Sequence, residues 1–337
     1  MKKFITYFFI IICSVSCTAL QDDGGTAGEG VTCLSLDVSV DGQSAVVTKV
    51  DGTDFPSGSS IGIGIYKHEA GIPADFVEFN YGQTNIRATK SGSGWSFDAN
   101  GDGHTYTNLY ITKNKDSSTA DLYAYAPFVQ DVKSPDSIKY DITATNYDVM
   151  WASQNAESTN KELIPGANGG ETQIDLDFKH VFALIRVGVK LHHSGSTVNL
   201  NRISLYHADE ANKTTPIYNK VDFNALNGTF NQKFEGDSLY RSGSNLSSYT
   251  DYVYYDFVVV PEELDENWRI KFRVNDIEYG YCDITPDMVE HTDGTKGFKA
   301  GYRYNFNFIL DNYVRFDSVT IDDEWVTNAK FTDYIMV

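Results

Sequence analysis

The sequence is poor in methionine, cysteine and positive charge, and these shortages exclude several classes of protein. Its 337 residues include only 4 Met and 4 Cys, and 27 Lys and Arg stand against 46 Asp and Glu, a formal net charge of −19. Such a surface repels phosphate backbones, so we expect no nucleic-acid partner. Four cysteines do not make a small disulfide scaffold. Hydrophobic residues make up 41% of the chain, which excludes general disorder and predicts a large core.

Groups of residues that carry catalysis or hold cofactors are also scarce. The 7 His are scattered, and neither His192-His193 nor Glu290-His291 has further His or Cys at zinc-ligand spacing. Carboxylates are abundant, but the sequence alone cannot pair two of them across a glycosidic bond. We therefore expect a protein that is not an enzyme and has no cofactor.

One segment resembles the start of a calcium loop. Asp98, Asn100 and Asp102 place oxygen ligands at alternate positions before Gly103. The twelfth position is Leu109 rather than a bidentate Glu, so three side chains face a cation that needs six or more oxygens. These three residues are the candidate metal ligands, and a plain hairpin turn is the alternative interpretation.

The amino terminus has the features of a secretion signal. Met1-Lys2-Lys3 is positive, Phe4–Ile12 is apolar, and small residues precede Cys17. This arrangement resembles a bacterial lipobox and predicts a signal peptide over residues 1–16, with lipid on Cys17, followed by a flexible tether over 17–32. An ordinary cleaved signal is the alternative. We expect an outer-membrane lipoprotein that is exposed at the cell surface.

Apolar and polar residues alternate with a period of two over many short segments, and turn-forming clusters separate these segments. A sustained helical period is absent, so the sequence predicts an all-β protein. The expected strands are Leu34–Val40, Ser44–Val50, Ile61–Tyr66, Leu109–Thr112, Leu122–Ala126, Asp148–Ala152, Ile174–Phe178, Val181–Leu191, Tyr252–Val260, Trp268–Val274, Glu278–Cys282 and Tyr302–Leu310.

A polar stretch between the strands predicts a division into two β-sandwich domains. Residues 153–172 contain Pro165-Gly166 and Gly169-Gly170, which are typical of a linker. We expect an N-terminal β-sandwich over 33–160, a linker over 161–173 and a C-terminal β-sandwich over 174–337. Cys33 and Cys282 fall in different halves, and the sequence leaves open whether they form a disulfide.

Several segments, in this order, resemble the fimbrillin family, the type V pilins of Bacteroidales. The resemblance covers nearly the whole chain after the signal. It rests on Thr48-Lys49, Phe55, Ser60–Ile63, Tyr123–Phe128, Leu176–Ala183, Phe257–Pro261, Gly301–Phe306 and Ile321–Trp325.

The resemblance implies two tandem transthyretin-like β-sandwich domains with Greek-key strands, and a fimbrial subunit that assembles by strand exchange. In that family a trypsin-like protease cuts after a basic residue that follows the first strand, and here the matching position is Lys49. Because the enzyme prefers Arg and the first Arg is Arg87, an accessory or anchor role stays open. The implied partners are other fimbrial subunits, the outer membrane through the lipid anchor, and host or bacterial surface receptors that it would contact in adhesion.

The end of the chain supplies a candidate donor strand. Residues 329–337 alternate apolar and polar side chains, with Ala329, Phe331, Ile335 and Val337 as the candidate inserting residues. A strand that folds back onto its own domain is the alternative.

A second function is a cell-surface glycan-binding lipoprotein, in which exposed aromatic rings stack on sugars. Its candidate platforms are Trp95, Trp151, Trp268 and either Tyr279 or Tyr281. Burial of these rings in the core is the alternative.

Overall fold

The structure is a computed structural model that describes most of the two halves of the chain. The described residues are 31–40, 55, 57–67, 85–92, 94–98, 105–106, 109–112, 120–130, 132, 135–143, 148–154, 171–207, 216–264, 268–311 and 314–322. Within them the protein is almost entirely β-strand, which confirms the predicted all-β class. No helix in these ranges has the length and hydrophobicity to cross a membrane.

The strands of the first half belong mainly to one sheet. They are β1 (Val31–Val40), β2 (Ser60–Lys67), β3 (Ile86–Ser91), β4 (Gly94–Asp98), β5 (Thr105–Tyr106), β6 (Leu109–Thr112), β7 (Ala120–Ala126), β8 (Ile138–Asp141), β9 (Met150–Gln154) and β10 (Glu171–His180).

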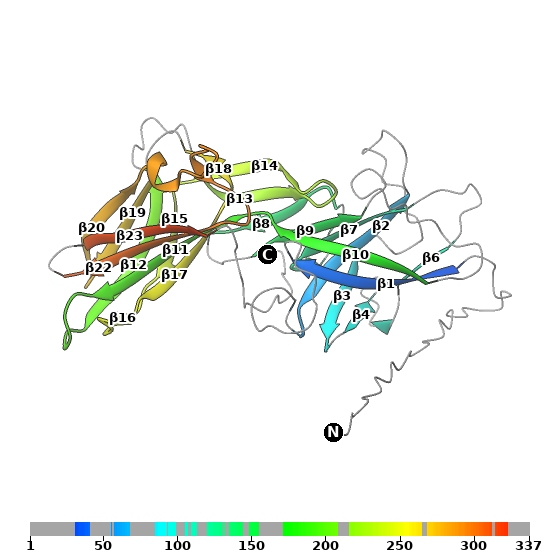
Figure 1. The fold of residues 1–337 in the computed structure, drawn as a ribbon, viewed down its shortest axis with the longest axis horizontal. Helices are drawn as coiled ribbons and strands as arrows, with labels where there is room; N and C mark the ends of the chain where they lie inside the picture. Colours follow the sequence, from blue (N-terminus) through cyan, green and yellow to red (C-terminus); the bar gives the residue numbers. More distant parts are fainter. Residues whose placement is uncertain are drawn as a thin grey trace, which may run out of the picture.

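The strands of the second half form a second lobe (Figure 1). They are β11 (Ala183–Leu191), β12 (Val198–His207), β13 (Ile217–Asn224), β14 (Thr229–Gly236), β15 (Ser238–Ser242), β16 (Asn245–Leu246), β17 (Val253–Val259), β18 (Glu262–Glu263), β19 (Trp268–Val274), β20 (Ile277–Ile284), β21 (Gly297–Phe298), β22 (Arg303–Leu310) and β23 (Val314–Asp322), with one 3-10 turn, η1 (Pro286–Val289).

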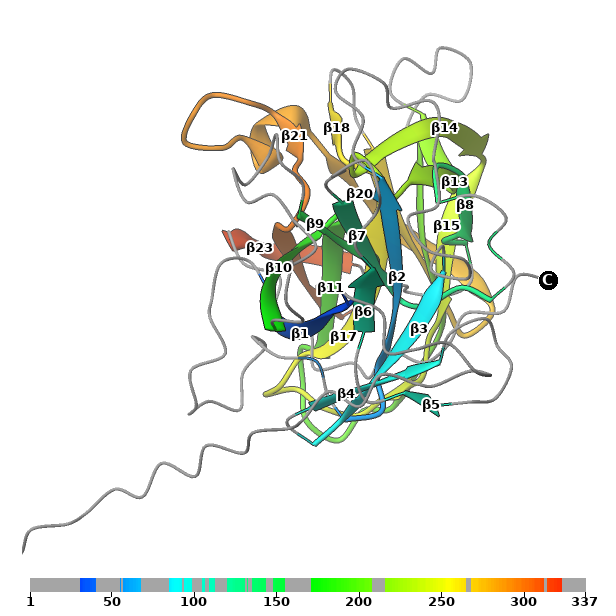
Figure 2. The ribbon, with the colours of Figure 1, turned by 90° about the vertical axis from the view of Figure 1, so that its right-hand side faces the viewer.

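The first lobe is a nine-stranded sheet in the order β5-β4-β3-β2-β7-β9-β10-β1-β6. The sheet curves, so that β10 and β1 lie to one side of β7 and β9, and β2 and β3 lie to the other (Figure 2). Buried side chains from β2, β3, β4, β7, β9 and β10 form one hydrophobic cluster inside this curve. Ile61, Ile63 and Ile65 of β2 alternate with glycine and are all fully buried. Because alternate residues of a strand face the same side, this pattern places the three isoleucines on the face that lines the cluster.

The second lobe has two sheets that pack face to face. One is four-stranded, in the order β17-β11-β22-β23, and the other is five-stranded, in the order β15-β12-β19-β20 with β16 also paired to β12. The rings of Phe272 on β19 and Phe308 on β22 lie 4.9 Å apart across this interface. On β22, Tyr304, Phe306 and Phe308 are fully buried while the residues between them are half-buried, so the aromatic rings share one buried face. β11 is buried at nearly every position, as expected for a central strand that is covered on both faces.

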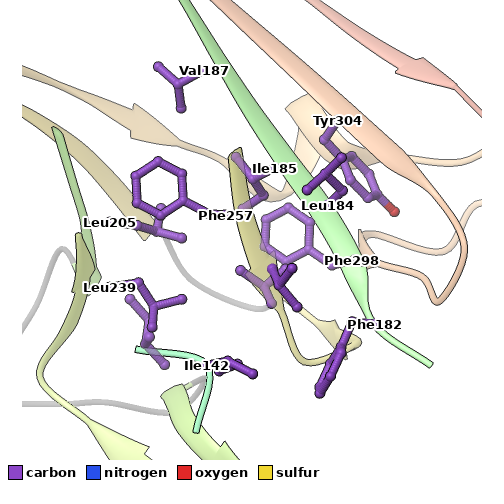
Figure 3. Close-up of a cluster of buried hydrophobic side chains, with 14 of the residues drawn as sticks. Ile142, Phe182, Leu184, Ile185, Val187, Leu205, Leu239, Phe257, Phe298 and Tyr304 are labelled. Carbon is purple, nitrogen blue, oxygen red and sulfur yellow. The ribbon is translucent and has the colours of Figure 1, made fainter. Parts of the chain in front are cut away.

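Strand pairing between the lobes crosses the expected linker in both directions. β10, which lies mostly after residue 174, belongs to the sheet of the first lobe. β8, from the first half, pairs with β13 in a three-stranded sheet with β14. Ile142, just after β8, is fully buried in the core of the second lobe, near Leu239 (Figure 3). The domain boundaries at 160 and 174 therefore stay a prediction. The structure shows that strands on each side of the expected linker pair with the lobe on the other side.

β10 and β11 are joined by only Val181 and Phe182. Phe182 is fully buried in the second core, and its ring stacks on Phe230 at 5.5 Å. The described part of the chain thus passes from one lobe into the other without an exposed spacer at this point.

Cys282 lies on β20 and is a free thiol, half-buried. Burial raises the pKa of this thiol to about 11, so it stays protonated at neutral pH. The disulfide with Cys33 that the sequence left open is not formed in this structure.

Candidate strand-exchange site

β1, the first of the described strands, lies between β10 and β6 near one end of the nine-stranded sheet. It pairs in parallel with β10 over eight residue pairs, from Cys33 opposite Glu171 to Val40 opposite Phe178. On its other side it pairs antiparallel with β6, and within the described residues this pairing covers only Val31–Leu34. β1 is therefore held by β10 from Cys33 to Val40 and by β6 from Val31 to Leu34.

The register places β1 beside the part of β10 that contributes to the core. Val38 is opposite Leu176, and Val40 is opposite Phe178. Leu176 and Phe178 are 1% and 0% exposed, whereas Asp177 between them is half-buried. If β1 left the sheet, the backbone groups of β10 over Glu171–Phe178 would lose their partners beside this core edge.

β10 has anchors that do not depend on β1. The ring of Phe178 packs edge-on against Phe55 at 5.1 Å. At the end of the strand, His180 pairs with β9 opposite Met150, and its imidazole Nδ1 lies 2.5 Å from Oδ1 of Asp148. Both side chains are nearly inaccessible to solvent. β10 is thus fixed to the first core and to β9 at its carboxyl end, away from most of its contact with β1.

A third link fixes the same end of β10 to the second lobe. The indole nitrogen of Trp151, on β9, donates a hydrogen bond to the carbonyl of Ala225. A side chain at Gly228 would clash with the same indole, because a Cβ there would lie 2.6 Å from it. The backbone N–H of Val181 also donates to the carbonyl of Val149 at 3.0 Å. These contacts hold the junction together on both sides.

The two basic residues considered for processing differ in their place in the chain. Lys49 lies outside the described residues, between the end of β1 at Val40 and the start of β2 at Ser60. Arg87 lies within β3, where its Nε donates to Ser60 Oγ at 3.4 Å and its guanidinium stands over the ring of Phe128. A cut at Arg87 would require β3 to leave the sheet. The expected strand Ser44–Val50, which contains Lys49, lies outside the described residues.

The other predicted site residues are only partly described. The lipidation candidate Cys17 and the donor residues Ala329, Phe331, Ile335 and Val337 lie outside the described residues, as do Asn100 and Asp102. Asp98 is the last residue of β4 and pairs with Thr105 of β5. β4 and β5 thus form a hairpin around the candidate calcium segment.

The aromatic platforms proposed for glycan binding lie in four different places. Trp268 is 2% exposed in the second core, and Trp151 is half-buried at the junction. Trp95 is half-buried on β4, where it packs against Phe55 at 5.8 Å. On β20, the hydroxyl of Tyr279 donates to the backbone of Asp311, and only Tyr281 is largely exposed, at 57%. These rings do not form a shared binding surface.

The sequence analysis missed Asp148 as the partner of His180. His180 was part of the Leu176–Ala183 segment, and Asp148 was the first residue of an expected strand, but nothing in the sequence joined them. Each is a single titratable residue beside the apolar end of a strand. A buried titratable group needs a hydrogen-bonding partner, and this requirement could have suggested the pair.

Comparison with known proteins agrees with this architecture. A family model described as fimbrillin-like matches residues 48–325. The chain belongs to the fimbrillin-like family. No curated protein matches it.

Solved structures share the fold of this fimbrillin-like chain at low sequence identity. A proposed cell adhesion protein from Bacteroides ovatus is 16% identical, with a TM-score of 0.56 over 89% of this chain and 100% of that one. Another, from Bacteroides uniformis, is 15% identical, with a TM-score of 0.51 over 88% of this chain and 98% of that one. At such identities the likeness shows the fold alone.

Proposed function

We propose that this fimbrillin-like protein is a surface-exposed fimbrial subunit, or an accessory or anchor lipoprotein, that assembles by strand exchange and contributes to adhesion. The observation that supports the proposal is the position of β1. It is the first strand of the sheet, it lies beside a core edge of β10, and it precedes Lys49 in the chain. A cut after Lys49 would separate β1 from every other strand.

Loss of β1 would create a site that favours a replacement strand. The eight paired positions of β10 would lose their backbone partners, and an unpaired strand edge is a template for another chain. The buried side chains of Leu176 and Phe178 lie on this strand. Full burial of an apolar side chain stabilises by roughly 1.5–3 kcal/mol, so a replacement strand that keeps these residues buried is favoured. The anchors of β10 on Phe55 and Asp148 would keep the acceptor strand in place.

The proposed donor is the tail, residues 329–337, of a neighbouring subunit. The tail has nine residues and no Pro or Gly, so as a strand it extends about 30 Å. β1 has ten residues, so the lengths correspond. Ala329, Phe331, Ile335 and Val337 are apolar and can supply the inserting side chains.

We further propose that lipid on Cys17 holds the protein in the outer membrane, with residues 17–32 as a tether. The partners are other fimbrial subunits and, in adhesion, receptors on host or bacterial surfaces. Mass spectrometry of the amino-terminal peptide tests the anchor. Acylation at Cys17, and its loss in Cys17→Ser, is the expected result, and a free amino terminus at another residue would contradict it.

Limited digestion of the full-length protein with a trypsin-like protease tests the strand exchange. We expect cleavage after Lys49 and polymers that appear by size-exclusion chromatography and electron microscopy. Deletion of residues 329–337 should stop chain growth without changing the circular dichroism spectrum. Lys49→Gln should stay uncut and monomeric, while Arg87→Gln, the matched control, should be cut and polymerise. A cleaved wild-type protein that stays monomeric would exclude a shaft subunit and favour the anchor or accessory role.

A further inference from the structure

Two strands of the second lobe end side by side and carry three metal-ligating residues beyond their ends. β11 and β22 are parallel neighbours, and their last residues, Leu191 and Leu310, are directly paired. His192 and His193 follow β11, and Asp311 follows β22. Because β11 starts next to the first lobe, its far end lies at the pole of the second lobe that points away from the first (Figure 1).

The three side chains meet at this pole. Nδ1 of His192 lies 2.8 Å from Nε2 of His193 and 3.3 Å from Oδ2 of Asp311. One candidate ligand atom from each residue falls within a group whose members are all within 4.8 Å of one another. Among the described residues, no other three His, Cys, Asp or Glu side chains are gathered in this way.

These distances suit a common metal ion. Ligand atoms at about 2.0–2.1 Å from a zinc ion lie roughly 3.3 Å apart in a tetrahedron, and roughly 2.9 Å apart at right angles. The separations of 2.8 and 3.3 Å from His192 to His193 and to Asp311 are therefore close to the spacing of ligand atoms around a divalent ion. The atoms of His193 and Asp311 lie within 4.8 Å of each other, so the three side chains form one candidate ligand group.

The backbone beneath the ligands is fixed. The N–H of His192 donates to the carbonyl of Leu310 at 2.9 Å, and the N–H of Leu191 donates to the carbonyl of Ser248 at 2.8 Å. The hydroxyl of Tyr279 donates to the backbone carbonyl of Asp311. The site thus rests on the ends of two central strands rather than on a free loop, which limits the ordering that binding has to supply.

The donor set selects the class of ion. Two imidazoles and one carboxylate suit Zn²⁺, Ni²⁺ and Cu²⁺, whereas Ca²⁺ and Mg²⁺ prefer oxygen ligands throughout. His193 is exposed, and His192 and Asp311 have side chains 37% and 32% exposed, so solvent can supply the remaining ligands. Three protein ligands with an open position are typical of zinc that can take a further ligand.

We propose that His192, His193 and Asp311 form a binding site for a divalent transition-metal ion, with Zn²⁺ as the probe. The site lies apart from β1 and β10, so it does not depend on strand exchange. An ion here would place an open coordination position at the outer pole of the subunit.

Isothermal titration of the full-length protein with Zn²⁺ tests the site. The wild type should bind Zn²⁺. The His193→Ala and Asp311→Asn variants should each bind it with at least 10-fold lower affinity. Asp293→Asn, which removes an exposed carboxylate from a different turn, should bind as the wild type does. Zn²⁺ should also raise the thermal unfolding midpoint of the wild type and leave that of the His192→Ala/His193→Ala double variant unchanged.

The proposal would be overturned by two results. One is a wild type that does not bind Zn²⁺ at millimolar concentration. The other is a double variant that binds Zn²⁺ as tightly as the wild type, because the ion would then occupy other ligands. Circular dichroism of each variant shows that it is folded.

Discussion

Nδ1 of His180 lies 2.5 Å from Oδ1 of Asp148, and this pair ties the last residue of β10 to the segment that enters β9. Side-chain exposure is 0% for His180 and 6% for Asp148. A hydrogen bond between side chains so little exposed to water is strong, so the loss of either member should be destabilising.

Asp148→Ala is therefore expected to lower the free energy of unfolding by about 3 kcal/mol. Urea denaturation followed by tryptophan fluorescence measures it. Glu235→Gln, at an exposed position of β14, is the control and should not change the urea midpoint of unfolding. An Asp148→Ala variant with the same urea midpoint of unfolding as the wild type would show that the pair does not stabilise the position of β10.

Stability should fall as the pH falls through the titration of His291. Burial lowers the pKa of this imidazole, although a hydrogen bond from its ring to the carbonyl of Gly297 partly offsets the effect. Nε2 also lies 2.8 Å from the hydroxyl of Tyr304. The unfolded chain takes up a proton near pH 6.5, whereas the folded protein does so only at lower pH, so protons favour unfolding in between.

The free energy of unfolding should thus be lower at pH 5.5 than at pH 7.5, and His291→Gln should show a smaller loss over this range. Urea titrations at the two pH values give both quantities. Equal losses in the wild type and the variant would show that other groups cause the dependence.

Gly243 should not tolerate any side chain. A Cβ at this position would lie 1.9 Å from the carbonyl oxygen of Leu200, a backbone atom that cannot rotate away. Gly243→Ala is expected to destabilise the protein by at least about 2 kcal/mol, measured by thermal unfolding. Gly94→Ala is the matched control, because the nearest atom to its Cβ would be 4.0 Å away. A similar unfolding midpoint for the two variants would contradict the close approach at Gly243.

Arg241 links the second lobe to residues that precede the expected linker. Its Nη1 donates to the carbonyl of Thr143 at 3.0 Å, and its Nε donates to the carbonyl of Asp256 at 2.8 Å. Burial lowers the pKa of Arg241 to about 10, which leaves the guanidinium charged at neutral pH.

Arg241→Met should cost about 2 kcal/mol, because the carbonyls of Thr143, Tyr240 and Asp256 lose a charged donor. Arg241→Lys should recover little, since one ammonium cannot serve all of them in the geometry of the planar fork. Urea denaturation measures both variants, and Arg273→Met, at the exposed position of β19, is the control. Full recovery by lysine would show that charge alone matters at this position.

Local sequence pattern predicted the strands with the clearest alternation, and failed where strands are mostly exposed. β22 was predicted nearly to the residue because its aromatic rings share one face. β14 was not predicted, because only three of its eight positions are half-buried and none is buried. Its stability comes from pairing with β13, a contact that the pattern within β14 does not reveal.

Contacts between distant segments account for the other omissions. β8, from the first half, pairs with β13 of the second half, and the residue pattern of neither segment predicts this pairing. Likewise, His192-His193 lacked any nearby ligand in the sequence, and only the parallel pairing of β11 with β22 brings Asp311 to them.

A pull along the long axis of the molecule would pass from the first lobe into the second through Val181 and Phe182. β10 runs along that axis in Figure 1, and β11 continues away from the first lobe. Such a force loads the hydrogen bonds beside these strands in shear, so that many must break together instead of one after another. The short connection would make the subunit stiff under tension, and atomic force microscopy of a tethered chain would record this as a high rupture force before either lobe extends.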